Sequence, residues 1–207
     1  MPTLPAPLPP LLPPLILGST SPYRRALLQR LRLAFSTDAP RVDEMPRSGE
    51  TPAELAPRLA LQKACEVASR HPGAVVIGAD QVADLAGRLI GKPLNHDRAL
   101  AQLRAMRGQT VVFHSAVAVF APGTGRAQVR VAPVVVRFRR LGDAEIERYL
   151  RLDQPYDCAG SAKCEALGIA LLDSVESDDP TALEGLPLIH TCALLREAGI
   201  DPLAPAA

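Results

Sequence analysis

The sequence lacks tryptophan and any excess of charge of one sign. Aromatic residues make up only 3% of its 207 residues, so the hydrophobic core must be built from leucine, valine, isoleucine and alanine. The 23 lysines and arginines are nearly balanced by 22 aspartates and glutamates. General nucleic-acid binding usually needs a large basic surface. The balance therefore argues against a nucleic-acid partner, and it leaves room for a local basic cleft that binds a small anion.

Paired cysteines and long hydrophobic runs are also missing. The sequence contains no CxxC pair and no paired histidine spacing among its four cysteines, Cys65, Cys158, Cys164 and Cys192. This pattern argues against a zinc site or a disulfide framework and favours reduced thiols. The apolar run 11–17 is interrupted by prolines and follows no basic region, so it predicts neither a signal peptide nor a membrane span. We expect a cytoplasmic protein with no membrane partner.

The composition predicts an ordinary folded protein with an unusual start. Hydrophobic residues account for 47% of the chain and charged residues for 22%, as in globular domains. Seven of the first fourteen residues are proline, which predicts an extended arm over residues 1–13. Residues 14–200 are predicted to form a single two-lobed domain, and residues 201–207 a tail.

Local patterns predict strands mixed with helices. We expect strands near residues 15–17, 35–39, 74–79, 110–120, 128–139 and 168–173, and a hairpin over 81–90 that turns at Gly87. We expect helices that begin at the N-caps Ser21 and Thr51, and further helices over 97–106, 142–150 and 187–198. Ala26 and Cys65 are expected on the apolar sides of the first two helices. The mixture implies an α/β fold with a mixed β-sheet and flanking helices.

The segment Gly18–Leu28 joins a strand, a small-residue loop and a helix N-terminus. The N–H groups of such a terminus bind phosphate, and Arg24 and Arg25 add positive charge in the first turn. Because arginine there opposes the helix dipole, a bound anion would account for its presence. The alternative is a solvated basic helix start that Ser21 only caps.

Two acids and two lysines are further candidates. Asp80 is expected at the end of the strand 74–79, where a carboxylate must meet a metal, a base or water; the alternative is a turn-forming aspartate. Glu44 lies with Asp43 in a polar loop, and from these residues alone a solvated acidic loop is the more ordinary interpretation. Lys63 and Lys92 are the two lysine candidates, and lysines of this kind are typical of surface charges as well as of phosphate ligands.

Together these segments resemble the Maf family of nucleotide pyrophosphatases. The matching stretches are LILGSTSPYRRALLQRL, RVDE, LALQKA, VIGADQV, GKPL, FHSAVAVF, VRFRRL and YDCAGSAKCEALGIALLDSVESDDPTALEGLPL. They run in order from Leu15 to about Gly199, so only the proline-rich arm and the last residues lie outside. Each motif alone has little specificity, whereas eight in this order are specific. Gly18 and Ala79 replace other small residues of the family's motifs, which removes no functional group.

The resemblance implies a two-lobed fold similar to that of inosine triphosphate pyrophosphatases, with a nucleotide in the cleft between the lobes. It also implies hydrolysis between the α and β phosphates, with Asp80 as the catalytic carboxylate that orients or deprotonates the water. The phosphate-binding positions are Ser19, Arg24, Lys63 and Lys92. Glu44 and Asp80 would hold a divalent metal cation (Mg²⁺, Mn²⁺ or Co²⁺), since such ions prefer oxygen ligands and bridge phosphates.

Three positions are similar to the family branch that acts on 7-methyl-GTP: Tyr23, Gln81 and Glu165. The branch that acts on dTTP and UTP carries a basic residue at the first of them. Methylation at N7 makes guanine cationic, so stacking on Tyr23 would add a cation–π energy of ~0.5–2 kcal/mol, and Glu165 would balance the charge. The alternative is that Tyr23 packs against the core and Glu165 pairs with Lys163.

Two other functions stay open at this point. The first keeps the chemistry but changes the small-molecule nucleotide substrate to dTTP or UTP. The second is a non-catalytic nucleotide-binding regulator of cell division, an association that the family's name carries. The presence of Asp80, Glu44 and both lysines argues against a regulator, because a binding protein needs no carboxylate that activates water. The oligomeric state is not fixed, and a homodimer is one option.

Overall fold

The computed structural model describes residues 13–204, so the predicted proline-rich arm lies outside them except for Pro13. The strands are β1 (Leu15–Gly18), β2 (Ser36–Asp38), β3 (Val75–Leu85), β4 (Arg88–Ile90), β5 (Thr110–Ala121), β6 (Arg126–Phe138) and β7 (Leu172–Glu176). The helices are α1 (Pro22–Gln29), α2 (Pro52–Arg70), α3 (His96–Met106), α4 (Asp143–Asp153) and α5 (Leu188–Glu197). Three 3₁₀ turns complete the elements of the described residues: η1 (Ala159–Ser161), η2 (Leu167–Leu171) and η3 (Ala182–Glu184).

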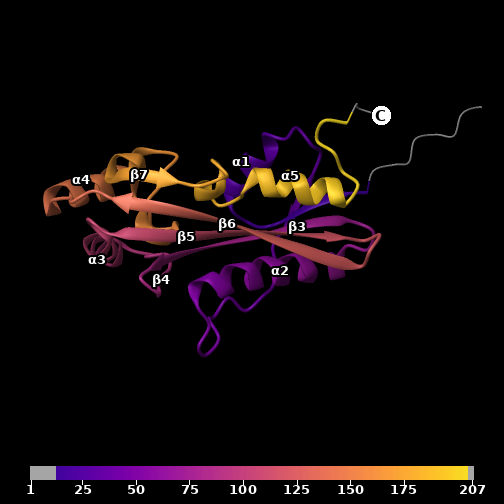
Figure 1. Ribbon diagram of the computed structural model, residues 1–207, viewed down its shortest axis with the longest axis horizontal. Helices are drawn as coiled ribbons and strands as arrows, with labels where there is room; N and C mark the ends of the chain where they lie inside the picture. The colour runs from indigo at the N-terminus through magenta and orange to yellow at the C-terminus, as the bar shows by residue number, and fades with distance from the viewer. Residues whose placement is uncertain (1–12, 205–207) are drawn as a thin grey trace, which may run out of the picture.

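The strands form one mixed seven-stranded sheet in the order β2-β1-β3-β5-β6-β7, with β4 paired to β3. Helix α2 covers one face of this sheet, and α1 and α5 cover the other (Figure 1). Helices α3 and α4 lie together at the far end of β5 and β6 (Figure 1). The predicted α/β fold with a mixed, helix-flanked sheet is confirmed. No helix within residues 13–204 is long and apolar enough to cross a membrane.

Strand β3 continues past Asp80, so the prediction that the strand ends at Ala79 is wrong. The reason is its antiparallel neighbour β5, which pairs with β3 without a break from Val76 to Asp84. On its other edge, β3 pairs with β1 only as far as Gly78 and with β4 only from Ala83 onward. The edge of β3 between these two neighbours is therefore open, and Asp80 lies within it.

Glycine at position 78 allows α2 to approach β3 unusually closely. The odd-numbered residues of Val75–Ala79 pack into the core beneath α1 and α5, and Gly78 faces α2. A Cβ atom on Gly78 would lie 2.3 Å from the carbonyl oxygen of Ala60 and 2.5 Å from the backbone nitrogen of Ala64. Since carbon atoms in contact are ordinarily about 3.5–4.0 Å apart, no larger residue fits here without moving the helix.

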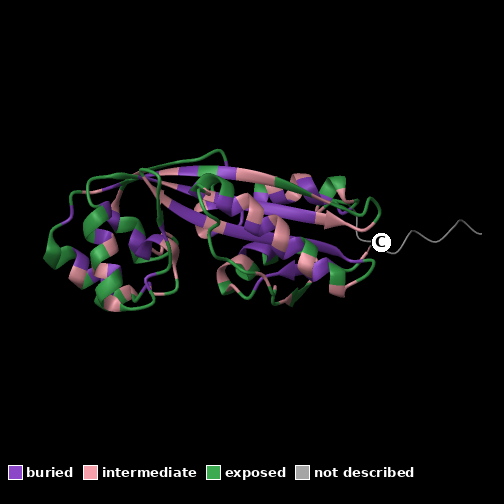
Figure 2. Cartoon of the chain, turned by 90° about the horizontal axis from the view of Figure 1, so that it is seen from below, coloured by how far each residue is buried: buried purple, intermediate pink, exposed green. Residues whose placement is uncertain are grey.

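The long strands contribute to hydrophobic cores at both ends of the sheet. Strand β5 contributes Val117 and Val119 to the core with α1 and α5, and Val111 and Phe113 to the core with α3 and α4. Figure 2 shows the buried residues following these strands while the exposed residues follow the outer helix faces and the loops. The same backbone therefore supports both ends of the molecule.

Most of the predicted elements are confirmed, and the exceptions have local causes. Ser21 and Thr51 cap α1 and α2 as expected. The strand expected over residues 168–173 begins only at Leu172, because the Gly168 N–H donates to the Lys163 carbonyl and closes a turn. Ala26 and Cys65 are exposed, since their neighbours occupy the buried faces of α1 and α2.

Candidate active site

A cavity of about 570 Å³ opens beside the uncovered edge of β3. Its walls come from the loop after β1, the loop before α2, the middle of α2 and β3, and the segment after β4. Eight of the predicted site residues line it: Ser19, Tyr23, Arg24, Glu44, Lys63, Asp80, Gln81 and Lys92. Glu165 is not among the lining residues.

Lys63 joins the two acids that the sequence keeps far apart. Its Nζ lies 2.7 Å from Asp80 Oδ1 and 2.8 Å from Glu44 Oε1. Lys63 and Asp80 are buried, with 5% and 7% of their surfaces exposed, and a buried charge is tolerated when it is paired in this way. The pair forms because Asp80 faces α2 two residues after Gly78, where the helix approaches the strand most closely.

The remaining oxygens of the two acids suit a metal that arrives with its substrate. Asp80 Oδ2 and Glu44 Oε2 accept no hydrogen bond from any residue in the range 13–204. In that same range no three histidine, cysteine, aspartate or glutamate side chains gather to hold an ion by themselves. Mg²⁺ commonly binds through one or two carboxylates together with substrate phosphates. The donor set therefore fits a divalent cation shared with a polyphosphate.

The loop after β1 places two further groups in the cavity. The Ser19 hydroxyl accepts a hydrogen bond from the Ser21 backbone N–H at 3.2 Å, and Ser21 in turn caps α1. Arg24, in the first turn of α1, donates from Nε to the Gly185 carbonyl at 2.9 Å. Burial lowers the pKa of the Arg24 guanidinium, and the two cavity carboxylates partly counter that effect. The arginine is thus held at the cavity wall from its Nε side.

Lys92 supplies a positive charge from another part of the wall, just after β4. Its side chain is exposed, and it lines the cavity. Within the described part of the chain it forms no ion pair. With Arg24 and Lys63 it gives the cavity three cationic side chains from three separate segments, which is the charge that a polyphosphate requires.

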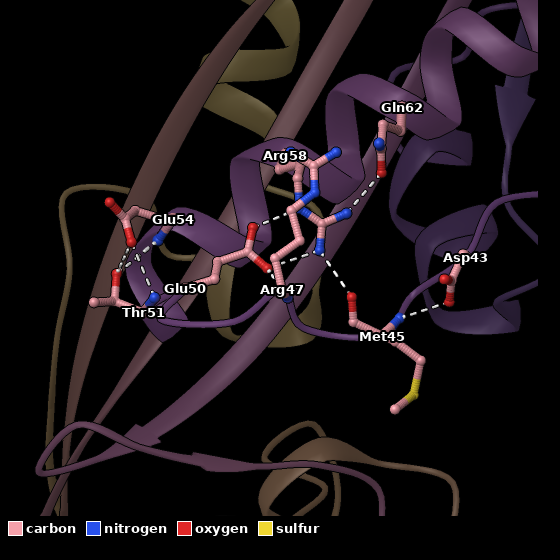
Figure 3. Close-up of polar contacts among 8 residues, drawn as sticks. All are labelled: Asp43, Met45, Arg47, Glu50, Thr51, Glu54, Arg58 and Gln62. Atoms are coloured by element: carbon pink, nitrogen blue, oxygen red, sulfur yellow. Dashed lines mark hydrogen bonds and ion pairs between the residues drawn. The ribbon is translucent and has the colours of Figure 1, made fainter.

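Arg58 of α2 holds the loop that carries Glu44 (Figure 3). Its Nη2 donates to the Met45 carbonyl at 3.1 Å, and its Nε and Nη2 donate to the Glu50 carboxylate at 2.5 and 2.8 Å. These bonds, followed by one from the Arg47 backbone, lower the pKa of Glu50 from 4.5 to about 2. Because Met45 follows Glu44 directly, the position of Glu44 depends on an arginine that no sequence pattern indicates.

Gln81 faces the other side of the sheet from Asp80, as neighbours in a strand must. Its Nε2 donates to the Ser115 hydroxyl at 2.9 Å and to the carbonyls of Ala182 and Leu183 at 3.0 Å. All three partners accept, since the Ser115 hydroxyl gives its own proton to Ala182. This arrangement fixes the orientation of the amide and leaves Oε1 to accept hydrogen bonds.

Tyr23 lies in the cavity wall rather than in the core. Its hydroxyl donates to Asp157 Oδ2 at 3.2 Å. Burial, and then the neighbouring Cys158 and Asp157, raise the pKa of Tyr23. Lys163 lies 3.6 Å from Asp157 Oδ1 and forms no ion pair with Glu165. Both parts of the alternative considered for these residues, a core tyrosine and a Lys163–Glu165 pair, are therefore wrong.

Glu165 lies outside the cavity, between the turns η1 and η2. It is exposed as a residue, while partial burial of its carboxyl group, and then the nearby Glu184, raise its pKa. The predicted contact between Glu165 and a bound base stays a prediction. Asp157, which the sequence reasoning did not single out, is the acid that lines the cavity beside Tyr23. The sequence feature that could have indicated Asp157 is its position in the segment YDCAGS, which belongs to one of the motifs shared with the family.

Comparison with known proteins gives one consistent result. The pattern of a family described as Maf-like protein matches residues 14–198. A 7-methyl-GTP pyrophosphatase of Albidiferax ferrireducens is 62% identical over 189 residues, which is 91% of this chain and 95% of that protein. A 7-methyl-GTP pyrophosphatase of Polaromonas sp. is 64% identical over 187 residues (90% and 85%). One of Bordetella pertussis is 55% identical over 197 residues (94% and 97%).

Proposed function

Because the chain belongs to the Maf family, we propose that it is a nucleotide pyrophosphatase that hydrolyses 7-methyl-GTP to 7-methyl-GMP and diphosphate. The observation that carries the chemistry is the buried Lys63, which holds Asp80 and Glu44 together in the wall of a cavity. The substrate follows from the relatives that bear this name at 55–64% identity over most of their length.

The cationic side chains serve the polyphosphate. Ser19 and Arg24, next to the N-terminus of α1, bind phosphate oxygens together with Lys63 and Lys92. Transfer of a phosphoryl group depends mainly on positioning and on neutralising charge. The three cations come from the helix α1, the helix α2 and the segment after β4. A triphosphate that contacts all three is therefore held at several points along its length.

Asp80 is the proposed base. Its Oδ1 is fixed by Lys63, which leaves Oδ2 to orient a water molecule and accept its proton as the water oxygen bonds to phosphorus. The bond between that phosphorus and the bridging oxygen breaks, and diphosphate leaves with the negative charge that Arg24 and Lys92 neutralise. Glu44 does not need to move protons in this scheme; it supplies an oxygen ligand and an acceptor for Lys63.

Glu44 and Asp80 would hold a divalent cation, of which Mg²⁺, Mn²⁺ and Co²⁺ are the candidates. When bound, such an ion neutralises phosphate oxygens and lowers the pKa of a coordinated water. Glu44 Oε2 is free for this purpose, and Asp80 Oδ2 has a second lone pair besides the one that would accept the proton of the water. We expect the ion to bind weakly without nucleotide, since the two protein ligands are too few for a closed site.

The decisive experiment measures diphosphate release from 7-methyl-GTP, GTP, dTTP and UTP, with and without each metal. We expect release from 7-methyl-GTP above the others and none without metal. An Asp80→Asn variant should lose at least ~100-fold in rate, as expected for removal of a general base, and an Asp173→Asn variant on β7 should match the wild type. Near-normal turnover by Asp80→Asn would refute its role.

The same assay separates the two alternatives. Preference for dTTP or UTP would overturn the substrate while keeping the chemistry. Binding of a triphosphate without any release of diphosphate would identify a nucleotide-binding regulator instead of an enzyme. The wild-type protein alone is sufficient for this comparison, because the outcomes differ only in which nucleotide, if any, releases diphosphate.

A further inference from the structure

Asp157 offers a negative charge at the part of the cavity where Tyr23 lies. It lines the cavity from the segment between α4 and η1, whereas Tyr23 belongs to α1. The hydrogen bond of 3.2 Å from the tyrosine hydroxyl to Asp157 Oδ2 therefore joins two segments that are 134 residues apart in the sequence. A base that stacks on the tyrosine ring would lie beside the carboxylate.

The charge of Asp157 is only partly neutralised by the protein. Lys163 approaches its Oδ1 to 3.6 Å, which is beyond ordinary hydrogen-bond distance, and Lys163 Nζ also donates to the Asp153 carbonyl at 3.2 Å. Burial raises the pKa of Asp157, but its own backbone N–H, Lys163 and its hydrogen-bonding neighbours lower it overall below its usual range. The carboxyl group is therefore ionised at neutral pH.

We propose that Asp157 is a specificity-determining residue that favours a cationic purine over a neutral one in the base-binding part of this cavity. This inference rests on the proposed function, and it gives to Asp157 the charge-balancing role that the sequence alone suggested for Glu165. Asp157 lines the cavity and contacts Tyr23, whereas Glu165 does neither. The ligand is a purine nucleotide with a fixed positive charge on its ring, and the neutral purine nucleotide of the same size is its natural comparison.

The carboxylate acts through charge, so its effect should be selective and sensitive to salt. Its side chain is 57% exposed, which places the interaction between the strong limit of a buried pair and the weak limit of bulk water. We expect removal of the charge to reduce the preference about tenfold. The preference of the wild type should also fall as ionic strength rises, because exposed charges are screened.

The test compares kcat/KM for 7-methyl-GTP and for GTP in four proteins: wild type, Asp157→Asn, Glu165→Gln and Asp173→Asn. Asparagine keeps an acceptor for the Tyr23 hydroxyl and removes only the charge. We expect Asp157→Asn to lower the ratio of the two kcat/KM values about tenfold, mainly through KM for 7-methyl-GTP. The kcat/KM of Asp157→Asn for GTP should stay at the wild-type value. The Glu165→Gln variant and the exposed β7 control Asp173→Asn should keep the wild-type ratio.

Three results would overturn the inference. An unchanged ratio in Asp157→Asn would remove any role in specificity, and an equal loss with both nucleotides would assign it to positioning or stability. Loss of the ratio in Glu165→Gln alone would return the role to that residue. A wild type that releases no diphosphate from either nucleotide would instead contradict the proposed function, so the two failures are distinguishable.

Discussion

Replacement of Gly78 by alanine should push helix α2 away from strand β3 and so move Lys63 away from Asp80. The added Cβ would lie 2.3 Å from the Ala60 carbonyl oxygen and 2.5 Å from the Ala64 nitrogen, so α2 must move away from β3 by about 1 Å to restore normal contact. Because Lys63 lies on that helix and Asp80 on that strand, the shift lengthens the 2.7 Å contact between them.

The expected losses follow from this displacement. Overpacking of a tight interface destabilises a protein by about 1–3 kcal/mol, and for a domain of this size each kcal/mol lowers Tm by about 2–4 °C. Differential scanning calorimetry should therefore show a Tm lower by about 2–12 °C. A misplacement of about 1 Å can reduce the rate of an enzyme about 100-fold, so release of diphosphate should fall by that order even at temperatures where the variant is folded.

Gly123→Ala is the matched control. Gly123 lies in the turn between β5 and β6, and nothing lies within 4 Å of its added Cβ. We expect this variant to keep the Tm and the activity of the wild type. If Gly78→Ala kept both as well, then the close approach of α2 to β3 would not be what sets the position of Lys63, and the reasoning above would be wrong.

Three further predictions follow from the contacts around the cavity. Arg58→Met should release the Glu44 loop and raise the metal concentration for half-maximal activity about 10–100-fold; a titration with Mn²⁺ measures this, and unchanged metal dependence would contradict it. Gln81→Glu should set a carboxylate against three acceptors and lower the unfolding free energy by about 1–3 kcal/mol, which calorimetry measures; an unchanged Tm would refute the assigned amide orientation. The folded-state pKa of Glu50 lies below its usual 4.5, at about 2, so its stabilising effect is full above about pH 4.5 and disappears as pH falls toward 2; the Tm difference from Glu50→Gln should shrink over that range, and a constant difference would argue against the Arg58 pairing.

The sequence predicted those parts of the fold that depend on local signals. Ser21 and Thr51 each carry a hydrogen-bonding side chain next to a proline at the first helical position, and such caps act within four residues. The position of Asp80 in mid-strand needed more than local signals. Its strand continues because β5 pairs with it, with Asp80 opposite Ala116, and pairing with such a distant segment leaves no mark in the residues around Asp80.

The candidate site shows the same division. The resemblance to a family predicts Glu44, Lys63 and Asp80 as site residues. In the structure, Lys63 Nζ lies 2.8 Å from Glu44 Oε1 and 2.7 Å from Asp80 Oδ1. Arg58 was not chosen, because its role depends on how the loop before α2 returns to the helix. Asp157 and Glu165 lie in an irregular segment of short turns, where no periodic pattern tells which of two acids faces a cavity.

Strands β3 and β5 contribute residues both to the core with α1 and α5 and to the core with α3 and α4, and β6 pairs with the whole length of β5. Neither end of the molecule can unfold alone without breaking backbone hydrogen bonds between strands that also support the other end. Heating should therefore give a single cooperative transition. A shared backbone of this kind also leaves no flexible connection about which the ends could rotate. The cavity is therefore formed when the chain folds, and we expect any adjustment on nucleotide binding to be confined to the loops at its rim.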